Sequence, residues 1–241
     1  DNLERGRAEK VAVYSDRGNR TYGELAEDAN RFGNGLLALG LGRGDRVLLL
    51  MDDTPSYPAA IFGAIRAGMV PILANTLSSP DLISFYIEDA GARVMIFDES
   101  HAGTVMALDA AALAPVTGIS VNGAGPSAVP DALDGAHWLA DQKTELEAAE
   151  TGRDEPAFMM YSSGSTGRPK GILHLQHDAL YTVESYARHI LHIGPDDICF
   201  SIPKIFFAYG FGNALRSEEH TSERQSHHDL VGRLPLEKKK I

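Results

Sequence analysis

Residues 161–171 read Tyr-Ser-Ser-Gly-Ser-Thr-Gly-Arg-Pro-Lys-Gly and directly follow the apolar run Ala-Phe-Met-Met at 157–160. Glycines let a backbone approach a ligand closely, and successive N–H groups in such turns form a concavity that binds anions. Lys170 adds a positive charge of the kind that binds phosphate, and hydroxyl donors come from Ser162, Ser163, Ser165 and Thr166. The composition therefore predicts a loop that binds a polyphosphate.

Two better-known phosphate-binding sequences do not fit this loop. A Walker A motif reads Gly-x-x-x-x-Gly-Lys followed by Ser or Thr. Here Gly164 and Gly167 are too close together, and Arg168 and Pro169 precede the lysine. The Gly-x-Gly-x-x-Gly fingerprint of dinucleotide sites does not occur in the loop either. The alternative without a binding role is a solvated Gly/Ser linker, but such linkers seldom end in Arg-Pro-Lys-Gly between two apolar segments.

At these residues the chain resembles the adenylate-forming superfamily, which includes acyl- and aryl-CoA ligases, luciferases and the adenylation domains of peptide synthetases. The phosphate-loop signature of that superfamily is Tyr/Phe-Thr/Ser-Ser-Gly-Ser/Thr-Thr-Gly-x-Pro-Lys-Gly, and residues 161–171 meet every position of it. In the superfamily this loop holds the β- and γ-phosphates of ATP and then the departing pyrophosphate. The resemblance therefore implies nucleotide binding by Ser162, Ser163, Gly164, Ser165, Thr166, Gly167 and Lys170.

A second unusual stretch, at 204–212, reads Lys-Ile-Phe-Phe-Ala-Tyr-Gly-Phe-Gly. Composition alone favours a piece of hydrophobic core, because most aromatic clusters are core. The order of residues, however, resembles that of benzoate–CoA ligases and close aryl–CoA ligases, in which the Ala-Tyr-Gly part lines the site of the benzoate ring. That resemblance implies an acid-binding site at Ala208, Tyr209 and Gly210, where a flat aromatic wall beside a small residue suits a planar ring.

Short apolar strands alternate with helical patterns along the chain. The capping box Thr21-x-x-Glu24 begins a helix that ends at Gly40, and Ser79-Pro80 caps another. Further helices are expected at 56–67 and roughly 178–192, and strands at 46–51, 69–74, 92–98, 118–121, 157–161 and 197–203. A strand, a glycine loop and a helix would then form the usual setting of a phosphate site. The alternation predicts an α/β fold of parallel or mixed sheets flanked by helices, and the resemblance implies part of the N-terminal domain of the adenylate-forming fold.

Charge and composition argue against several classes of partner. The chain has 241 residues, a formal net charge of −11, and no apolar run near the roughly 20 residues of a membrane span. Nucleic acid and membranes are therefore not expected as partners. The start of the chain is polar and lacks an initiator Met, so we expect no signal peptide and an incomplete N-terminus. The single cysteine, Cys199, lies in an apolar run, which favours a buried, inert thiol and a reducing cytoplasm.

The resemblance covers residues 2–215 and then stops abruptly. Residues 216–241 are polar, follow no helix or strand period, and resemble the translation of a sequencing-library adapter. We expect residues 1–215 to be the N-terminal part of an AMP-binding domain, and residues 216–241 to be a non-native, disordered tail; a natural charged tail is the alternative. Superfamily members are longer, so their small C-terminal domain with its catalytic lysine has no counterpart here, and no catalytic residue is assigned.

For the full-length parent, the resemblance implies that ATP and Mg²⁺ activate a benzoate-like aryl acid, which is then transferred to coenzyme A. The alternatives are an inactive nucleotide-binding fragment, a fatty-acyl–CoA ligase, and an adenylation domain that serves a carrier protein. Hydrolysis by a Ser-His-Asp triad is not expected, because no Gly-x-Ser-x-Gly elbow occurs. The pairs His174/His177 and His189/His192 could each share a helical face, but no set of cysteines or carboxylates completes a metal site, and no metal ligand is assigned. His101 has no partner that the sequence identifies.

Overall fold

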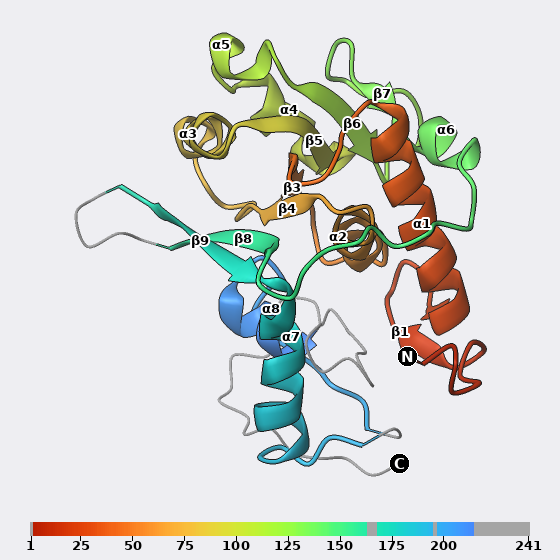
Figure 1. The fold of residues 1–241 in the computed structure, drawn as a ribbon. Helices are drawn as coiled ribbons and strands as arrows, with labels where there is room; N and C mark the ends of the chain where they lie inside the picture. Colours follow the sequence, from red (N-terminus) through yellow and green to blue (C-terminus); the bar gives the residue numbers. More distant parts are fainter. Residues whose placement is uncertain (1, 163–167, 195–196, 215–241) are drawn as a thin grey trace.

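The computed structural model describes residues 2–162, 168–194 and 197–214, and a mixed β-sheet forms its centre (Figure 1). The strand order within this part of the chain is β7-β6-β5-β3-β4-β8-β9. Neighbouring strands are parallel except for β8 and β9, which are antiparallel. The strands are β3 (Arg46–Leu50), β4 (Val70–Leu73), β5 (Ala92–Asp98), β6 (Thr117–Val121), β7 (Leu133–Asp134), β8 (Pro156–Ser162) and β9 (Lys170–Leu175). A separate antiparallel pair, β1 (Val11–Val13) and β2 (Arg20–Thr21), precedes the sheet.

Helices cover both faces of the parallel part, as the apolar strands predict. Successive side chains of a strand point to opposite faces. Helices α1 and α2 lie on one side of the parallel strands, and α3 and α4 lie on the other (Figure 1). In β3, Val47 and Leu49 belong to the core cluster that includes α1 and α2, whereas Leu48 and Leu50 belong to the cluster that includes α3 and α4. The helical segments are α1 (Tyr22–Ala38), α2 (Ser56–Arg66), α3 (Pro80–Ala90), η1 (Glu99–His101), α4 (Ala102–Met106), α5 (Ala110–Leu113), α6 (Gly135–Ala140), α7 (Gln176–Thr182), η2 (Val183–Arg188) and α8 (Ala208–Ala214).

The contact between α1 and α2 is close because glycines lie at the crossing. A Cβ atom added to Gly63 of α2 would overlap the Ala29 carbonyl oxygen and lie 2.8 Å from the Cβ of Phe32. A Cβ atom on Gly33 of α1 would in turn lie 2.8 Å from the Gly63 carbonyl oxygen. The missing side chains therefore let the two backbones pack almost directly against each other.

Most of the predicted elements are confirmed. Helix α1 begins at the predicted capping box, in which Thr21 Oγ1 accepts the Glu24 N–H and the Glu24 carboxylate accepts the Thr21 N–H. The strand expected at 92–98 is β5, with the same bounds. Ser79 is the N-cap of α3, but its side chain makes no capping hydrogen bond; its carbonyl oxygen accepts the N–H groups of Leu82 and Ile83 instead.

Two predictions after the glycine loop are wrong. The loop is followed by strand β9 and not directly by a helix. Strand β9 gives β8 a second hydrogen-bonded neighbour besides β4, and the pair is antiparallel because a short connection cannot join parallel strands. The expected strand at 197–203 does not form; within it only Cys199 makes an isolated bridge. Ile198, Phe200 and Ile202 of this segment lie at the surface, with Ile202 70% exposed.

Other predictions in this region need smaller corrections or cannot be compared. The expected helix at 178–192 begins at Gln176 and continues as the π-helical segment η2, which ends at Arg188. Cys199 is only half-buried, because the strand expected to bury it is absent. The tail at 216–241 lies outside the described residues.

Candidate functional site

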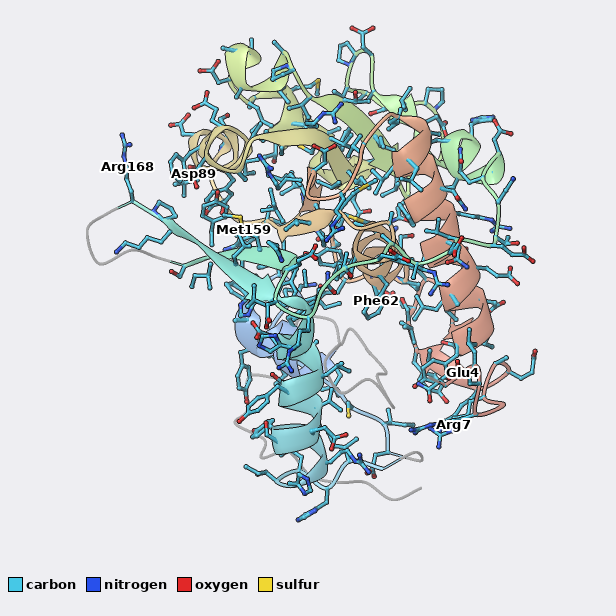
Figure 2. All side chains as sticks on the ribbon, viewed as in Figure 1. Glu4, Arg7, Phe62, Asp89, Met159 and Arg168 are labelled. Atoms are coloured by element: carbon cyan, nitrogen blue, oxygen red, sulfur yellow. The ribbon has the colours of Figure 1, made fainter. Side chains whose placement is uncertain are left out.

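The β8–β9 hairpin places the two ends of the phosphate-loop sequence next to each other. Ser162, at the end of β8, pairs with Lys170, at the start of β9. Both residues are exposed, and Figure 2 shows Arg168 at the far end of the hairpin, pointing away from the sheet. The predicted site residues Ser163, Gly164, Ser165, Thr166 and Gly167 lie outside the described residues. The described ends of the loop thus present a hydroxyl group and an ammonium group side by side.

An aromatic cluster fixes the base of this hairpin against α3. The Tyr161 ring stacks on Tyr86, with ring centroids 4.1 Å apart, and meets the edge of Phe85 at 6.1 Å. The Tyr161 hydroxyl donates a hydrogen bond of 2.7 Å to Asp89 Oδ2. Burial, together with the Asp89 carboxylate, raises the pKa of the Tyr161 hydroxyl, so it remains a donor at neutral pH. No local pattern in the sequence predicts this contact, because Asp89 lies 72 positions before Tyr161.

Phe158 of β8 connects the hairpin to the second motif. Its ring stacks on His174 of β9, with centroids 4.5 Å apart and planes at 10°. On the same ring packs Phe211 of α8, with centroids 4.6 Å apart. The aromatic segment at 204–212 therefore lies against the strand that leads into the phosphate loop. Two motifs separated in sequence become neighbours in the fold.

The aromatic segment divides into a buried part and an exposed part. Ile205, Phe206 and Phe211 are at most 5% exposed and belong to the main core. Of the predicted acid-binding residues, Ala208 and Tyr209 are exposed, Tyr209 by 63%, whereas Gly210 is buried. A Cβ atom on Gly210 would overlap the Lys204 carbonyl oxygen. The core interpretation of this stretch thus holds for its ends, while its middle offers a small residue and a tyrosine at the surface.

Comparison with known proteins identifies the family. The sequence model of the family described as "AMP-binding enzyme" matches residues 2–216. The chain belongs to this family. The benzoate–CoA ligase of Thauera aromatica is 40% identical over 215 residues, which cover 89% of this chain and 40% of that relative. Among solved structures, the anthranilate CoA ligase AuaEII in complex with anthranoyl-AMP has a TM-score of 0.87 at 30% identity, and a benzoate CoA ligase from Burkholderia xenovorans LB400 has 0.81 at 36%.

These relatives are considerably longer than the chain. Each of the two structural matches covers 92% of this AMP-binding chain but 43% of the solved one. The likeness confirms the predicted fold, a mixed α/β sheet flanked by helices that corresponds to the N-terminal domain of adenylate-forming enzymes. The sequence resemblance to the superfamily and to its benzoate–CoA ligases is confirmed as well.

A polar network that the sequence-based predictions did not include lies at the carboxyl ends of β3, β5 and β6 in this member of the AMP-binding family. Asp98 is 2% exposed; its Oδ2 accepts the Asp52 N–H at 2.7 Å, and its Oδ1 accepts from the Asn122 side-chain amide. His101 Nε2 lies 3.2 Å from Asp52 Oδ1, within ion-pair distance although poorly aligned for a hydrogen bond. The sequence signal was available: parallel strands place their carboxyl ends at one edge, and an aspartate ends or follows two of them.

The pKa values in this network follow from its geometry. The neighbouring His101 lowers the pKa of Asp52, and the Asp52 carboxylate raises the pKa of His101. Burial raises the pKa of Asp98, and its hydrogen bonds from Asp52 N–H and Asn122 oppose that shift only in part. The network thus ties together the carboxyl ends of β3, β5 and β6.

The histidines near the hairpin have carboxylate partners. His174 Nδ1 lies 3.2 Å from Asp178 Oδ2, and His177 contacts both Asp154 and Asp178 at 3.3 Å. No group of three or more His, Cys, Asp or Glu side chains within residues 2–162, 168–194 and 197–214 could hold a metal ion. In the same residues, none of the helices combines the length and the apolar character of a membrane span.

Proposed function

We propose that residues 1–215 are the N-terminal part of an AMP-forming acid–CoA ligase that activates a benzoate-like aryl carboxylate. The observation that carries the proposal is the contact between the two motifs through Phe158, which places an exposed Tyr209 segment beside the strand of the phosphate loop. The 40% identity to a benzoate–CoA ligase supports the same acid class. Because the chain spans about 40% of that relative, the activity is proposed for the complete protein.

The proposed reaction has two steps. A carboxylate oxygen of the acid attacks the α-phosphorus of ATP. The bond between the α-phosphorus and the oxygen that bridges to the β-phosphate breaks, pyrophosphate departs, and an acyl-adenylate is formed. The sulfur of coenzyme A then attacks the acyl carbon, loses its thiol proton, and displaces AMP to give a thioester. A carboxylate is a poor acyl donor, and adenylation supplies the leaving group. Positioning and charge neutralisation carry most of such catalysis.

The proposed roles follow the positions of the described residues. Ser162 and Lys170 face each other where the loop leaves the hairpin, a pairing that fits the phosphates of ATP and the departing pyrophosphate. Ser163, Gly164, Ser165, Thr166 and Gly167 are proposed to complete that site. Mg²⁺ would neutralise phosphate charge when ATP is bound; no ligand for it is assigned in this chain. Ala208, Tyr209 and Gly210 are proposed to orient the ring.

Pyrophosphate exchange into ATP tests the first step. We expect the complete protein to catalyse exchange with benzoate or a ring-substituted benzoate, and to release AMP when coenzyme A is added. Exchange with fatty or amino acids but with no benzoate would refute the aryl assignment. Adenylate formation without thioester formation would favour an adenylation domain that serves a carrier protein. Residues 1–215 alone are expected to be inactive, and exchange catalysed by them would contradict that expectation.

The boundary at residue 215 and the cytoplasmic location are also part of the proposal. Residues 216–241 are proposed to be foreign to the enzyme. Sequencing the locus from source DNA tests this, because an uninterrupted gene that encodes the same tail would refute it. Fractionation of the source cells tests the location, and the enzyme is expected with the soluble cytoplasmic proteins.

A further inference from the structure

Asp53 is a buried carboxylate that contacts the start of the aromatic segment. It follows β3, and its side chain is 2% exposed. Its Oδ1 accepts the backbone N–H of Ile205 at 3.1 Å, and its Oδ2 lies 3.7 Å from Nζ of Lys204. A carboxylate in such a place is costly unless it is paired and hydrogen-bonded. One side chain at the end of a central strand therefore holds a segment 152 residues later in the chain.

The held residues are closely linked to the exposed part of the segment. Phe207 N–H donates to the Lys204 carbonyl oxygen at 3.0 Å, which forms the turn into α8. A Cβ atom on Gly210 would overlap that same carbonyl and lie 2.5 Å from the Pro203 carbonyl oxygen. The first turn of α8 is thus packed directly on the backbone that Asp53 holds. A shift of Lys204 and Ile205 must move Tyr209 as well.

We infer that Asp53 is a positioning residue for the aryl acid. It acts through Lys204 and Ile205 to fix Ala208–Gly210, of which Ala208 and Tyr209 are exposed, an inference that rests on the acid-binding role proposed above. The phosphate-loop hairpin has its own anchor in the contact of Tyr161 with Tyr86 and Asp89. Loss of Asp53 should therefore weaken binding of the acid and leave binding of ATP nearly unchanged.

Steady-state exchange kinetics of the complete enzyme test this inference. In Asp53→Ala we expect the KM for the acid to rise roughly 10- to 100-fold, the range that a small misplacement of a binding group produces. The KM for ATP should change less than about twofold. Asp53→Asn keeps an acceptor for the Ile205 N–H and should recover part of the loss. Lys204→Met removes only the ion pair and should give a smaller increase in the acid KM.

Asp98→Asn is the matched control. Asp98 is a similarly buried carboxylate at the carboxyl end of the neighbouring strand β5, but it accepts its hydrogen bonds from the Asp52 N–H and the Asn122 side-chain amide. It should lower stability without a selective change in the acid KM. If Asp53→Ala does not fold, Asp53→Asn and Lys204→Met decide the matter. An unchanged acid KM in both, or an equal rise of the acid and ATP KM values in the Asp53 variants, would overturn the inference. If the wild type uses another acid class, the proposed function fails, and the same comparison with that acid still tests Asp53.

Discussion

At the residue scale, Lys170 has the clearest expected role. Its ammonium group is exposed at the last pair of the hairpin, opposite Ser162, where a phosphate could approach it. A hydrogen bond to a charged group contributes about 1.5–3 kcal/mol, so we expect Lys170→Ala to weaken ATP binding roughly 10- to 100-fold. Thr166→Ala should also weaken binding. Isothermal titration with ATP measures both effects.

Arg168→Ala is the control for that experiment. Arg168 is also an exposed cation beside the loop, and Figure 2 shows it pointing away from the sheet. Its place in the signature accepts any residue, so its loss should reduce ATP affinity by less than about threefold, as expected for a screened surface charge. Equal affinity of Lys170→Ala and the wild type would contradict the proposed phosphate loop.

The ion pair of His101 and Asp52 makes a second residue-scale prediction, for stability against pH. The pKa of His101 is raised in the folded protein, so its contribution is fully present below the unfolded value of about 6.5 and is lost as pH rises through the folded value. Between about pH 5.5 and 8.5 the thermal midpoint should therefore fall more in the wild type than in His101→Gln. Parallel pH profiles of the two proteins would show that the pair contributes nothing.

At the element scale, the parallel core could be predicted because its signals are local. The capping box of Thr21 and Glu24, and the buried run of β5, each carry their own structural information. Strand β9 could not be predicted this way. Its partner β8 is supplied by the fold, and its sequence Lys-Gly-Ile-Leu-His-Leu lacks a clean alternation. The contacts of Asp53 and Tyr161 could not be predicted for the same reason, because each joins residues that are far apart in sequence and that only the sheet brings together.

The crossing of α1 and α2 gives the element-scale prediction. A Cβ atom on Gly63 would overlap the backbone of α1, so Gly63→Ala should lower the free energy of unfolding by about 1–3 kcal/mol, the usual cost of overpacking. Gly103 of α4 is the matched control, because a Cβ atom there meets nothing within 4 Å. Gly103→Ala should be neutral or slightly stabilising. Urea unfolding of both variants measures the difference. Equal unfolding midpoints would show that α1 and α2 accommodate the added methyl group without loss of stability.

At the scale of the whole molecule, the exposed apolar side chains are unevenly distributed. Among the described residues, most of the large ones lie after residue 170, and these include Ile172, Leu173, Leu180, Tyr181, Ile190 and Ile202, between 45% and 73% exposed. Exposed apolar side chains concentrated in one part of a chain are typical of a surface that meets another part of a protein. In the proposed complete enzyme, the part that the longer relatives possess and this chain lacks would cover it.

Leu180→Glu separates a covered surface from a solvent-exposed one. Leu180 is 58% exposed on α7, so in residues 1–215 alone the substitution should leave stability unchanged and reduce aggregation. In the complete enzyme the same glutamate would be buried without a partner, which should cost about 2 kcal/mol or more. Met106→Glu, at a position 54% exposed on α4, should be neutral in both proteins, since α4 packs through Ala102 and Val105 into the core beneath α3. Thermal midpoints and light scattering are compared for the two substitutions, each made in residues 1–215 and in the complete enzyme. A neutral Leu180→Glu in the complete enzyme would mean that this face of α7 remains open to solvent when the enzyme is whole.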